Sequence, residues 1–67
     1  MISIYAINKR RPTDNGEGLM VELRGSSNDS KPIVIGDDFV DNGSTYIETN
    51  TGKVFIYDLD SQEWNEV

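Results

Sequence analysis

Residues Gly43–Val67, GSTYIETNTGKVFIYDLDSQEWNEV, are the stretch around which the rest of this chain is organised. Two segments, Thr45–Thr49 and Val54–Tyr57, are rich in the β-branched and aromatic residues that fit a pleated sheet. A two-residue type I′ turn between them would place the β-branched Thr51 at positive φ, which is unfavourable. We therefore predict a type I turn over Thr49–Gly52, with Gly52 left-handed in a G1 bulge.

This turn fixes a register for the predicted hairpin. The expected pairs are Thr49 with Lys53, Ile47 with Phe55 and Thr45 with Tyr57 on one face, and Glu48 with Val54 and Tyr46 with Ile56 on the other. Segment Val54–Tyr57 then carries large apolar side chains on both faces, and such a strand is normally covered on both. A chain this short has little with which to cover two faces. We predict that a curling neighbouring strand, another copy or another protein covers the second face.

The composition excludes several kinds of chemistry. The chain has 67 residues, no Cys and no His. It can form no disulfide, and it lacks the commonest metal ligand and the commonest general base near neutral pH. The sequence contains no recognisable pair of catalytic carboxylates. We therefore expect a protein that is not an enzyme and has no cofactor.

The charge of the chain bears on its partners. The chain has twelve acidic and six basic residues, which gives a net charge of −6. An acidic surface repels phosphate, so we expect no nucleic-acid partner. Solubility is the simplest reason for such acidity, and mimicry of nucleic acid or attraction to a basic protein is the alternative. We expect no membrane partner, because no apolar run is long enough to span one. The first residues, MISIYAINKRRP, also lack the features of a signal peptide.

The N-terminal half predicts two further strands. Met1–Asn8 alternates weakly, and Leu19–Arg24 alternates clearly between apolar and polar residues. We expect Pro12 to end any ladder, because it cannot donate a hydrogen bond. The cations Lys9, Arg10 and Arg11 would then lie in a solvated loop or contact an anion or partner. Residues 13–18, TDNGEG, are typical of turns, so the two strands could form a hairpin with a long loop.

The remaining segment, Gly25–Asp41, is the least regular. Ile33–Ile35 is a short apolar run that could be a buried strand. We predict no helix, because Trp64 and Val67 suit a closing strand better than a helical turn over Asp58–Glu66. The predicted fold is all-β: one small domain over residues 1–67, with an antiparallel sheet or a partly open barrel built from hairpins and a C-terminal three-stranded meander.

Two groups of oxygen-bearing side chains invite a calcium interpretation. They are Asp37, Asp38 and Asp41, and separately Asp58, Asp60 and Gln62. A calcium loop also needs a glycine at its sixth position and a bidentate glutamate at its twelfth. After Asp58 the sixth position is Glu63, and the sequence stops before a twelfth. Turn aspartates that cap their own backbone explain both groups more simply, so we expect no metal site.

Four aromatic residues have two interpretations. Tyr46, Phe55, Tyr57 and Trp64 are either core residues or, as candidate interface residues, contacts to a protein partner, where Tyr and Trp are enriched. Stacking on single-stranded nucleic acid would require a basic groove. A small chain buries few aromatics completely, so both of the first two interpretations stay open.

Two motifs carry a resemblance that covers about residues 19–67. The segment from Leu23 to Pro32, LRGSSNDSKP, resembles an LxGxSxDxKP pattern of short proteins encoded by tailed bacteriophages. The segment from Asn42 to Trp64 resembles their NGSTxYExDTGKxYxYD…W pattern, which also occurs in head-fibre and other virion-associated proteins. Asn50 stands where that pattern has Asp, and Ile33–Asp41 is a longer insert. The resemblance implies a small phage protein of the virion or of the structural genes, without catalysis.

Together these features predict a structural or interaction module. It would self-associate as a homo-oligomer or dock on a phage structural protein, in the virion or the host cytoplasm. The alternative is an acidic inhibitor directed at the host, which binds a basic host protein as a mimic of nucleic acid.

Overall fold

The computed structural model describes residues 1–67 and consists of strands, turns and loops without a helix. The strands are β1 (Ser3–Thr13), β2 (Gly16–Gly25), β3 (Val34–Ile35), β4 (Asp38–Val40), β5 (Thr45–Glu48), β6 (Val54–Asp58) and β7 (Glu63–Glu66). The all-β prediction is confirmed, and no segment forms a helix long and apolar enough to cross a membrane.

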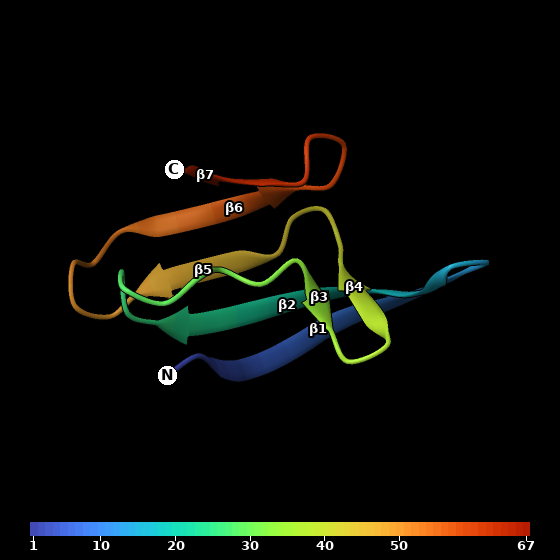
Figure 1. The fold of residues 1–67 in the computed structure, drawn as a ribbon, viewed down its shortest axis with the longest axis horizontal. Coiled ribbons are helices and arrows are strands. Elements are labelled where there is room, and N and C mark those ends of the chain that lie inside the picture. The colour runs from blue at the N-terminus through green and yellow to red at the C-terminus, as the bar shows by residue number, and fades with distance from the viewer.

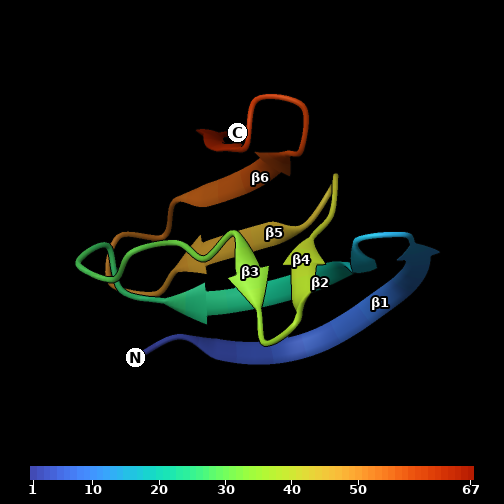
Figure 2. The ribbon, with the colours of Figure 1, turned by 45° about the vertical axis from the view of Figure 1, so that its right-hand side comes forward.

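One strongly curled sheet contains every strand, in the order β3-β4-β2-β5-β6-β7, with β1 also paired to β2. Figures 1 and 2 show β2 at its centre, with β1 along one side and β4 followed by β5 along the other. The predicted partly open barrel and C-terminal meander are confirmed. The sheet is mixed rather than purely antiparallel, because residues 26–33 cross back and let β4 and β5 run parallel to β2.

The N-terminal hairpin is longer than the sequence predicts. Its ladder continues to Thr13 opposite Gly16 and includes Pro12 opposite Glu17, so the prediction that Pro12 ends the ladder is wrong. An edge strand tolerates proline because one of its sides has no neighbour to bond. The predicted long loop is wrong too. A tight turn replaces it, in which the N–H of Asn15 donates to the hydroxyl of Thr13 at 3.2 Å.

The hairpin of β5 and β6 has a different register from the one predicted. Gly52 is left-handed, with φ of 78°, as predicted. Its N–H, however, donates to the carbonyl of Glu48 at 2.8 Å, and the N–H of Glu48 donates to the carbonyl of Lys53. These bonds pair Glu48 with Lys53 and leave a loop of four residues, Thr49–Gly52, whereas the predicted pair of Thr49 with Lys53 leaves three.

The longer loop shifts every pair by one residue, so the predicted register is wrong. Tyr46 lies opposite Phe55 rather than Ile56, and Ile47 lies opposite Val54 rather than Phe55. Because directly opposed residues share a face, Tyr46 and Phe55 point to one side and Ile47 and Val54 to the other.

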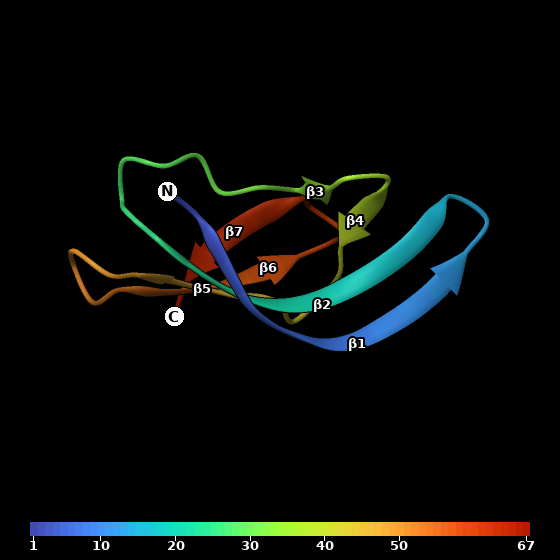
Figure 3. The ribbon, with the colours of Figure 1, turned by 90° about the horizontal axis from the view of Figure 1, so that it is seen from below.

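The core fills the concave side of the sheet. Its buried members are Leu19, Val21, Leu23, Val40, Tyr46 and Tyr57, with Ile2, Ile35, Phe55, Leu59 and Trp64 packed around them. The crossover of residues 26–33 and strand β3 lie over this side (Figure 3). The predicted buried strand Ile33–Ile35 is only partly correct: Ile35 reaches the core, whereas Ile33 is 44% exposed and Val34 60% exposed.

Parallel pairing to β2 is interrupted between β4 and β5. At the break, the side chain of Ser44 replaces a backbone partner of β2. Its hydroxyl accepts the N–H of Val21 at 3.1 Å and lies 2.9 Å from the carbonyl of Asp41. Ser44 is fully buried. The side-chain bond therefore keeps the two short strands on one line beside β2.

Candidate interaction surface

The surface of the molecule has no pocket. Every buried side-chain nitrogen or oxygen has a hydrogen-bond partner within the chain. A small-molecule site normally needs a concave pocket with a few convergent polar groups. What the structure offers to another molecule is therefore its faces and edges.

The four aromatic side chains singled out in the sequence gather on the concave side. Tyr46 and Tyr57 are buried, and Phe55 and Trp64 are partly buried against them. The ring of Trp64 lies 5.0 Å from that of Tyr57 and 6.0 Å from that of Tyr46, centre to centre. Burial raises the pKa of both tyrosines. Packing within the chain thus occupies much of the surface of these rings.

Trp64 also fastens the edge of the sheet to the crossover. Its indole N–H donates to the carbonyl of Pro32 at 3.0 Å. Trp64 stands on β7 and Pro32 on the segment that crosses the concave side, so this bond closes the half-barrel. The hydroxyl of Tyr46 donates to the carbonyl of Ser26 at 3.0 Å and holds the start of the same segment.

A lysine occupies the space that these rings leave. The ammonium group of Lys31 lies 4.1 Å from the centre of the Phe55 ring and 4.8 Å from that of Tyr46. It donates to Glu48 at 2.9 Å, and only 17% of the lysine side chain and 6% of the glutamate side chain are exposed. The hydroxyl of Thr51 and then the ammonium of Lys31 lower the pKa of Glu48. This cation is satisfied internally and is not free to bind a partner.

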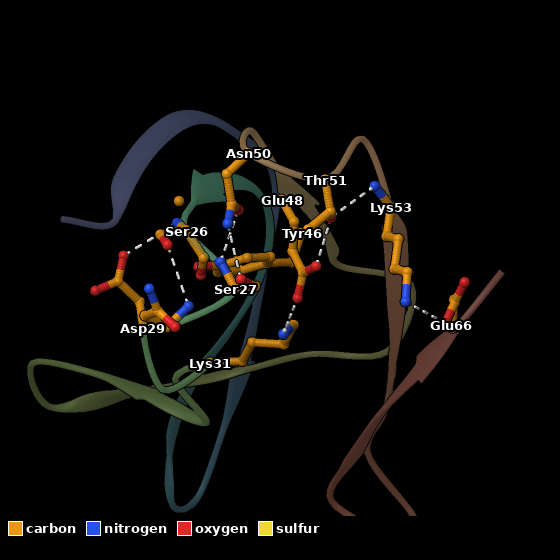
Figure 4. A network of polar contacts seen from close by, with 12 residues as sticks. Ser26, Ser27, Asp29, Lys31, Tyr46, Glu48, Asn50, Thr51, Lys53 and Glu66 are labelled. Carbon is orange, nitrogen blue, oxygen red and sulfur yellow. Dashed lines mark hydrogen bonds and ion pairs between the residues drawn. The ribbon is translucent and has the colours of Figure 1, made fainter.

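Further polar contacts attach the crossover to the β5–β6 turn (Figure 4). The side chain of Asn50 accepts the N–H of Ser27 at 2.9 Å and donates to its hydroxyl at 2.8 Å. Asp29 accepts the N-terminal ammonium at 2.9 Å and the N–H of Ser26 at 3.0 Å. Polar residues of segment 23–32 therefore make hydrogen bonds within the chain that hold the crossover over the concave side.

Among the three cations after Asn8, Arg11 alone has a close ionic partner. Its guanidinium donates two hydrogen bonds, each of 2.9 Å, to the carboxylate of Asp41, and lies 5.8 Å from the Phe39 ring. Arg10 lies 3.7 Å from Glu17, and both of these side chains are largely exposed. Lys9 makes no ion pair. The predicted solvated loop is wrong, because all three stand on β1.

The aspartate groups considered for calcium are used in other ways. Asp41 pairs with Arg11, which lowers the pKa of its carboxyl. Asp58 accepts the N–H of Asp60 and the hydroxyl of Ser61, at 3.2 and 3.0 Å. Asp38 accepts the N–H of Glu17. No group of three or more acidic side chains is arranged to hold a metal ion.

The convex face of the meander carries aliphatic side chains that the core does not cover. We call Ile47, Val54, Ile56 and Val67 the outer strip. Ile56 is 43% exposed and Val67 is 83% exposed, whereas Ile47 and Val54 are half-buried. The main-chain N–H of Val67 donates to Val54. A second apolar face on Val54–Tyr57 was predicted, but the predicted register put Ile47 beside Phe55 and so did not place Ile47 with Val54 on that face. The alternation within Val54–Tyr57 was the available signal.

Three strands have a neighbour on one side only: the two-residue β3, which pairs with β4, and the longer strands β1 and β7. β1 pairs only with β2, and β7 pairs only with β6, so each has one side without a neighbouring strand (Figure 1). Such edges offer unpaired backbone N–H and C=O groups to another strand. The side chains of β1 include Lys9, Arg10 and Arg11, whereas β7 carries Glu63 and Glu66.

Comparison with known proteins found no family model, no curated protein and no solved structure that matches this chain.

Proposed function

We propose that this protein is a non-enzymatic interaction module that docks on a protein assembly through its outer strip. The observation that carries the proposal is the two-faced hairpin β5–β6. Phe55 and Tyr57 point into the core of the chain, and Val54 and Ile56 point to the opposite side, away from the crossover; there Val54 is half-buried and Ile56 is exposed. A strand that is apolar on both faces is normally covered on both.

The surroundings of the strip also support a protein partner. Arg24 and Glu22 lie on the same face, opposite Ile47 and Thr45, so charged groups of both signs border the aliphatic side chains. An apolar centre with a polar rim is the usual anatomy of a protein interface. The absence of a pocket and of any His or Cys gives no support to catalysis.

The resemblance to short phage proteins suggests which assembly this is. The matching segments form the crossover and the meander, and the meander presents the outer strip. We propose that the partner is a structural protein of a tailed-phage particle. An acidic decoy that binds a basic host protein is the competing function, and the net charge of −6 supports it.

Particle association tests the proposal. Phage particles assembled in the presence of the wild-type chain are purified on a gradient, and the chain is quantified by mass spectrometry. Ile56→Thr should weaken the affinity for the particles about tenfold, equivalent to roughly 1.4 kcal/mol, because it removes an apolar contact while keeping a β-branched residue. At concentrations below saturation, the amount bound should fall by the same factor. Val34→Thr, on β3 and away from the strip, is the matched control and should bind normally.

Two results would count against the proposal. The first is a wild-type chain that never accompanies the particles. The second is binding that disappears steeply with added salt and ignores Ile56→Thr, as a charge-driven decoy would behave.

A further inference from the structure

Two of the edge strands, β1 and β7, differ in the charges that they carry. Half of the six basic residues of the chain, Lys9, Arg10 and Arg11, stand on β1. The ten residues from Asp58 to the end include Asp58, Asp60, Glu63 and Glu66 and no lysine or arginine. Figure 1 shows these two strands at opposite sides of the sheet.

Each edge keeps charge that the chain itself does not neutralise. On β1, Arg10 and Arg11 pair with Glu17 and Asp41, so Lys9 is the cation left without an ion pair. On the acidic side, neither Asp60 nor Glu63 meets a cation. Glu66 reaches Lys53 only at 4.0 Å, with both side chains about half exposed. Exposed pairs of that kind contribute little, so the acidic edge stays available to an outside cation.

The strand directions suit pairing between the two edges. β1 is antiparallel to β2, and β5 is parallel to β2. β6 reverses that direction and β7 restores it, so β7 runs opposite to β1. A second copy whose strands run in the same direction, rotated to follow the curl of the sheet, can therefore place its β7 antiparallel to β1 of the first.

Residues that lie side by side on successive strands form rows across the sheet. If these rows continue into the next copy, they define a register for the pairing. Ile7 pairs with Val21, Val21 bonds Ser44, Ser44 bonds Tyr57 and Tyr57 pairs with Trp64, which makes one row across the sheet. The next paired row begins at Lys9 on β1 and ends at Glu63 on β7. If the rows continue from copy to copy, Glu63 of the second copy lies beside Lys9 of the first.

The backbone of β7 is free to join such a pair. The N–H of Val67 points to β6, where it donates to Val54 at 2.9 Å. In an antiparallel ladder alternate residues bond alternate neighbours, so the backbone groups of Glu66 and Trp64 point to the free side. On β1, register shifts near Tyr5 and Asn8 let the four residues of β7 span the same rows as Ile4–Lys9.

We propose that copies of this protein assemble head to tail, with β1 of one copy antiparallel to β7 of the next. Backbone hydrogen bonds continue the sheet, and Lys9 faces Glu63 across the junction. Unlike surfaces meet in this contact, so it leads to a ring or a filament rather than a closed two-fold dimer. Pairing of two β1 edges brings two basic strands together with no added acid, and the charges do not favour it.

The test uses charge reversal and sedimentation velocity at low salt. The mass of the wild-type chain should rise with concentration beyond a dimer. Lys9→Glu and Glu63→Lys should each weaken association by about three- to tenfold, because attraction becomes repulsion. An equal mixture of the two variants should regain wild-type association, since every junction in an alternating assembly then joins opposite charges.

Several controls separate the outcomes. Asp14→Lys changes the net charge as much as Glu63→Lys does but lies in the β1–β2 turn, so it should associate normally. Circular dichroism checks that each variant is folded. Ile56→Thr should leave self-association intact, because Ile56 stands on β6, which is not an edge strand.

Three results would overturn the inference. They are a wild-type chain that stays monomeric up to millimolar concentration, a mass that stops at a dimer, and a mixture of the two variants that associates no better than either alone.

Discussion

The hydroxyl of Ser44 accepts the N–H of Val21 at 3.1 Å, where β4 has ended and β5 has not begun. Both residues are almost fully buried, so water cannot replace this bond. A buried N–H without a partner is costly, and here a side chain supplies the partner that the interrupted backbone lacks.

Replacing Ser44 by alanine should therefore destabilise the protein by about 1–3 kcal/mol, the cost of leaving a buried donor unsatisfied. Urea unfolding followed by circular dichroism measures the change. Ser61→Ala is the control, because the hydroxyl of Ser61 bonds only Asp58 at an exposed turn. A similar loss in both variants would show that the hydroxyl of Ser44 has no special role.

Acid should weaken the fold. The partners of Asp29, Asp41 and Glu48 lower the pKa of each carboxyl in the folded chain. The unfolded chain then binds more protons than the folded one, so this stability is present above the unfolded values of about 4 and is lost as pH falls below them. Urea midpoints between pH 7 and pH 2 should fall most steeply below pH 4.

Asp41→Asn should make that dependence shallower. It removes a carboxylate that accepts two hydrogen bonds from Arg11, so the variant should be less stable at pH 7 and lose less on acidification. Asp14→Asn, at an exposed turn, should keep the wild-type profile. An unchanged acid slope in Asp41→Asn would contradict the assignment.

Gly25 leaves room for the hydroxyl of Tyr46. A methyl group at residue 25 would collide with that hydroxyl and lie 3.1 Å from Ile2. Gly25→Ala should cost about 1–3 kcal/mol by overpacking, and Tyr46→Phe should cost about 1 kcal/mol through the lost bond to Ser26. The double variant should lose less stability than the sum of the two single losses. Without the tyrosine hydroxyl, the added methyl group has room. Simple additivity would contradict the collision.

Gly52 tests the hairpin loop. Its φ is 78°, and nothing lies within 4 Å of the position that a Cβ would take. Gly52→Ala should therefore lose about 1 kcal/mol from backbone strain alone, and Gly52→Asn should lose less, because asparagine tolerates this conformation. Thermal unfolding distinguishes them. Equal losses for Ala and Asn would point to a contact rather than to backbone strain.

The sequence predicted the type of structure better than its pairing. Alternation and β-branched residues indicated most of the strands, and the strain at Thr51 correctly placed Gly52 in the left-handed region. A three-residue and a four-residue loop both allow that conformation, however. The choice depends on whether the carbonyl of Glu48 receives the N–H of Gly52, which composition does not reveal.

The difference of one residue in the length of this loop determines which side chains make up the candidate interaction surface. Side chains alternate between faces, so a shift by one exchanges the partners of Ile47 and Tyr46. The sequence therefore predicted a second apolar face on Val54–Tyr57, but not that Ile47 shares it with Val54. The parallel place of β5 beside β2 was also beyond local patterns, because it depends on distant contacts such as Trp64 with Pro32 and Asn50 with Ser27.

The position of β2 also affects how the chain reaches its native state. β5, β6 and β7 follow one another in sequence and can join by closing short loops. β2 meets β5 only after the whole crossover has been looped back, from Glu22 to Thr45. The entropy of that closure is lost before any parallel bond forms, and such distant pairings fold slowly. The rate-limiting step of folding should therefore be the arrival of β2 beside an already formed meander.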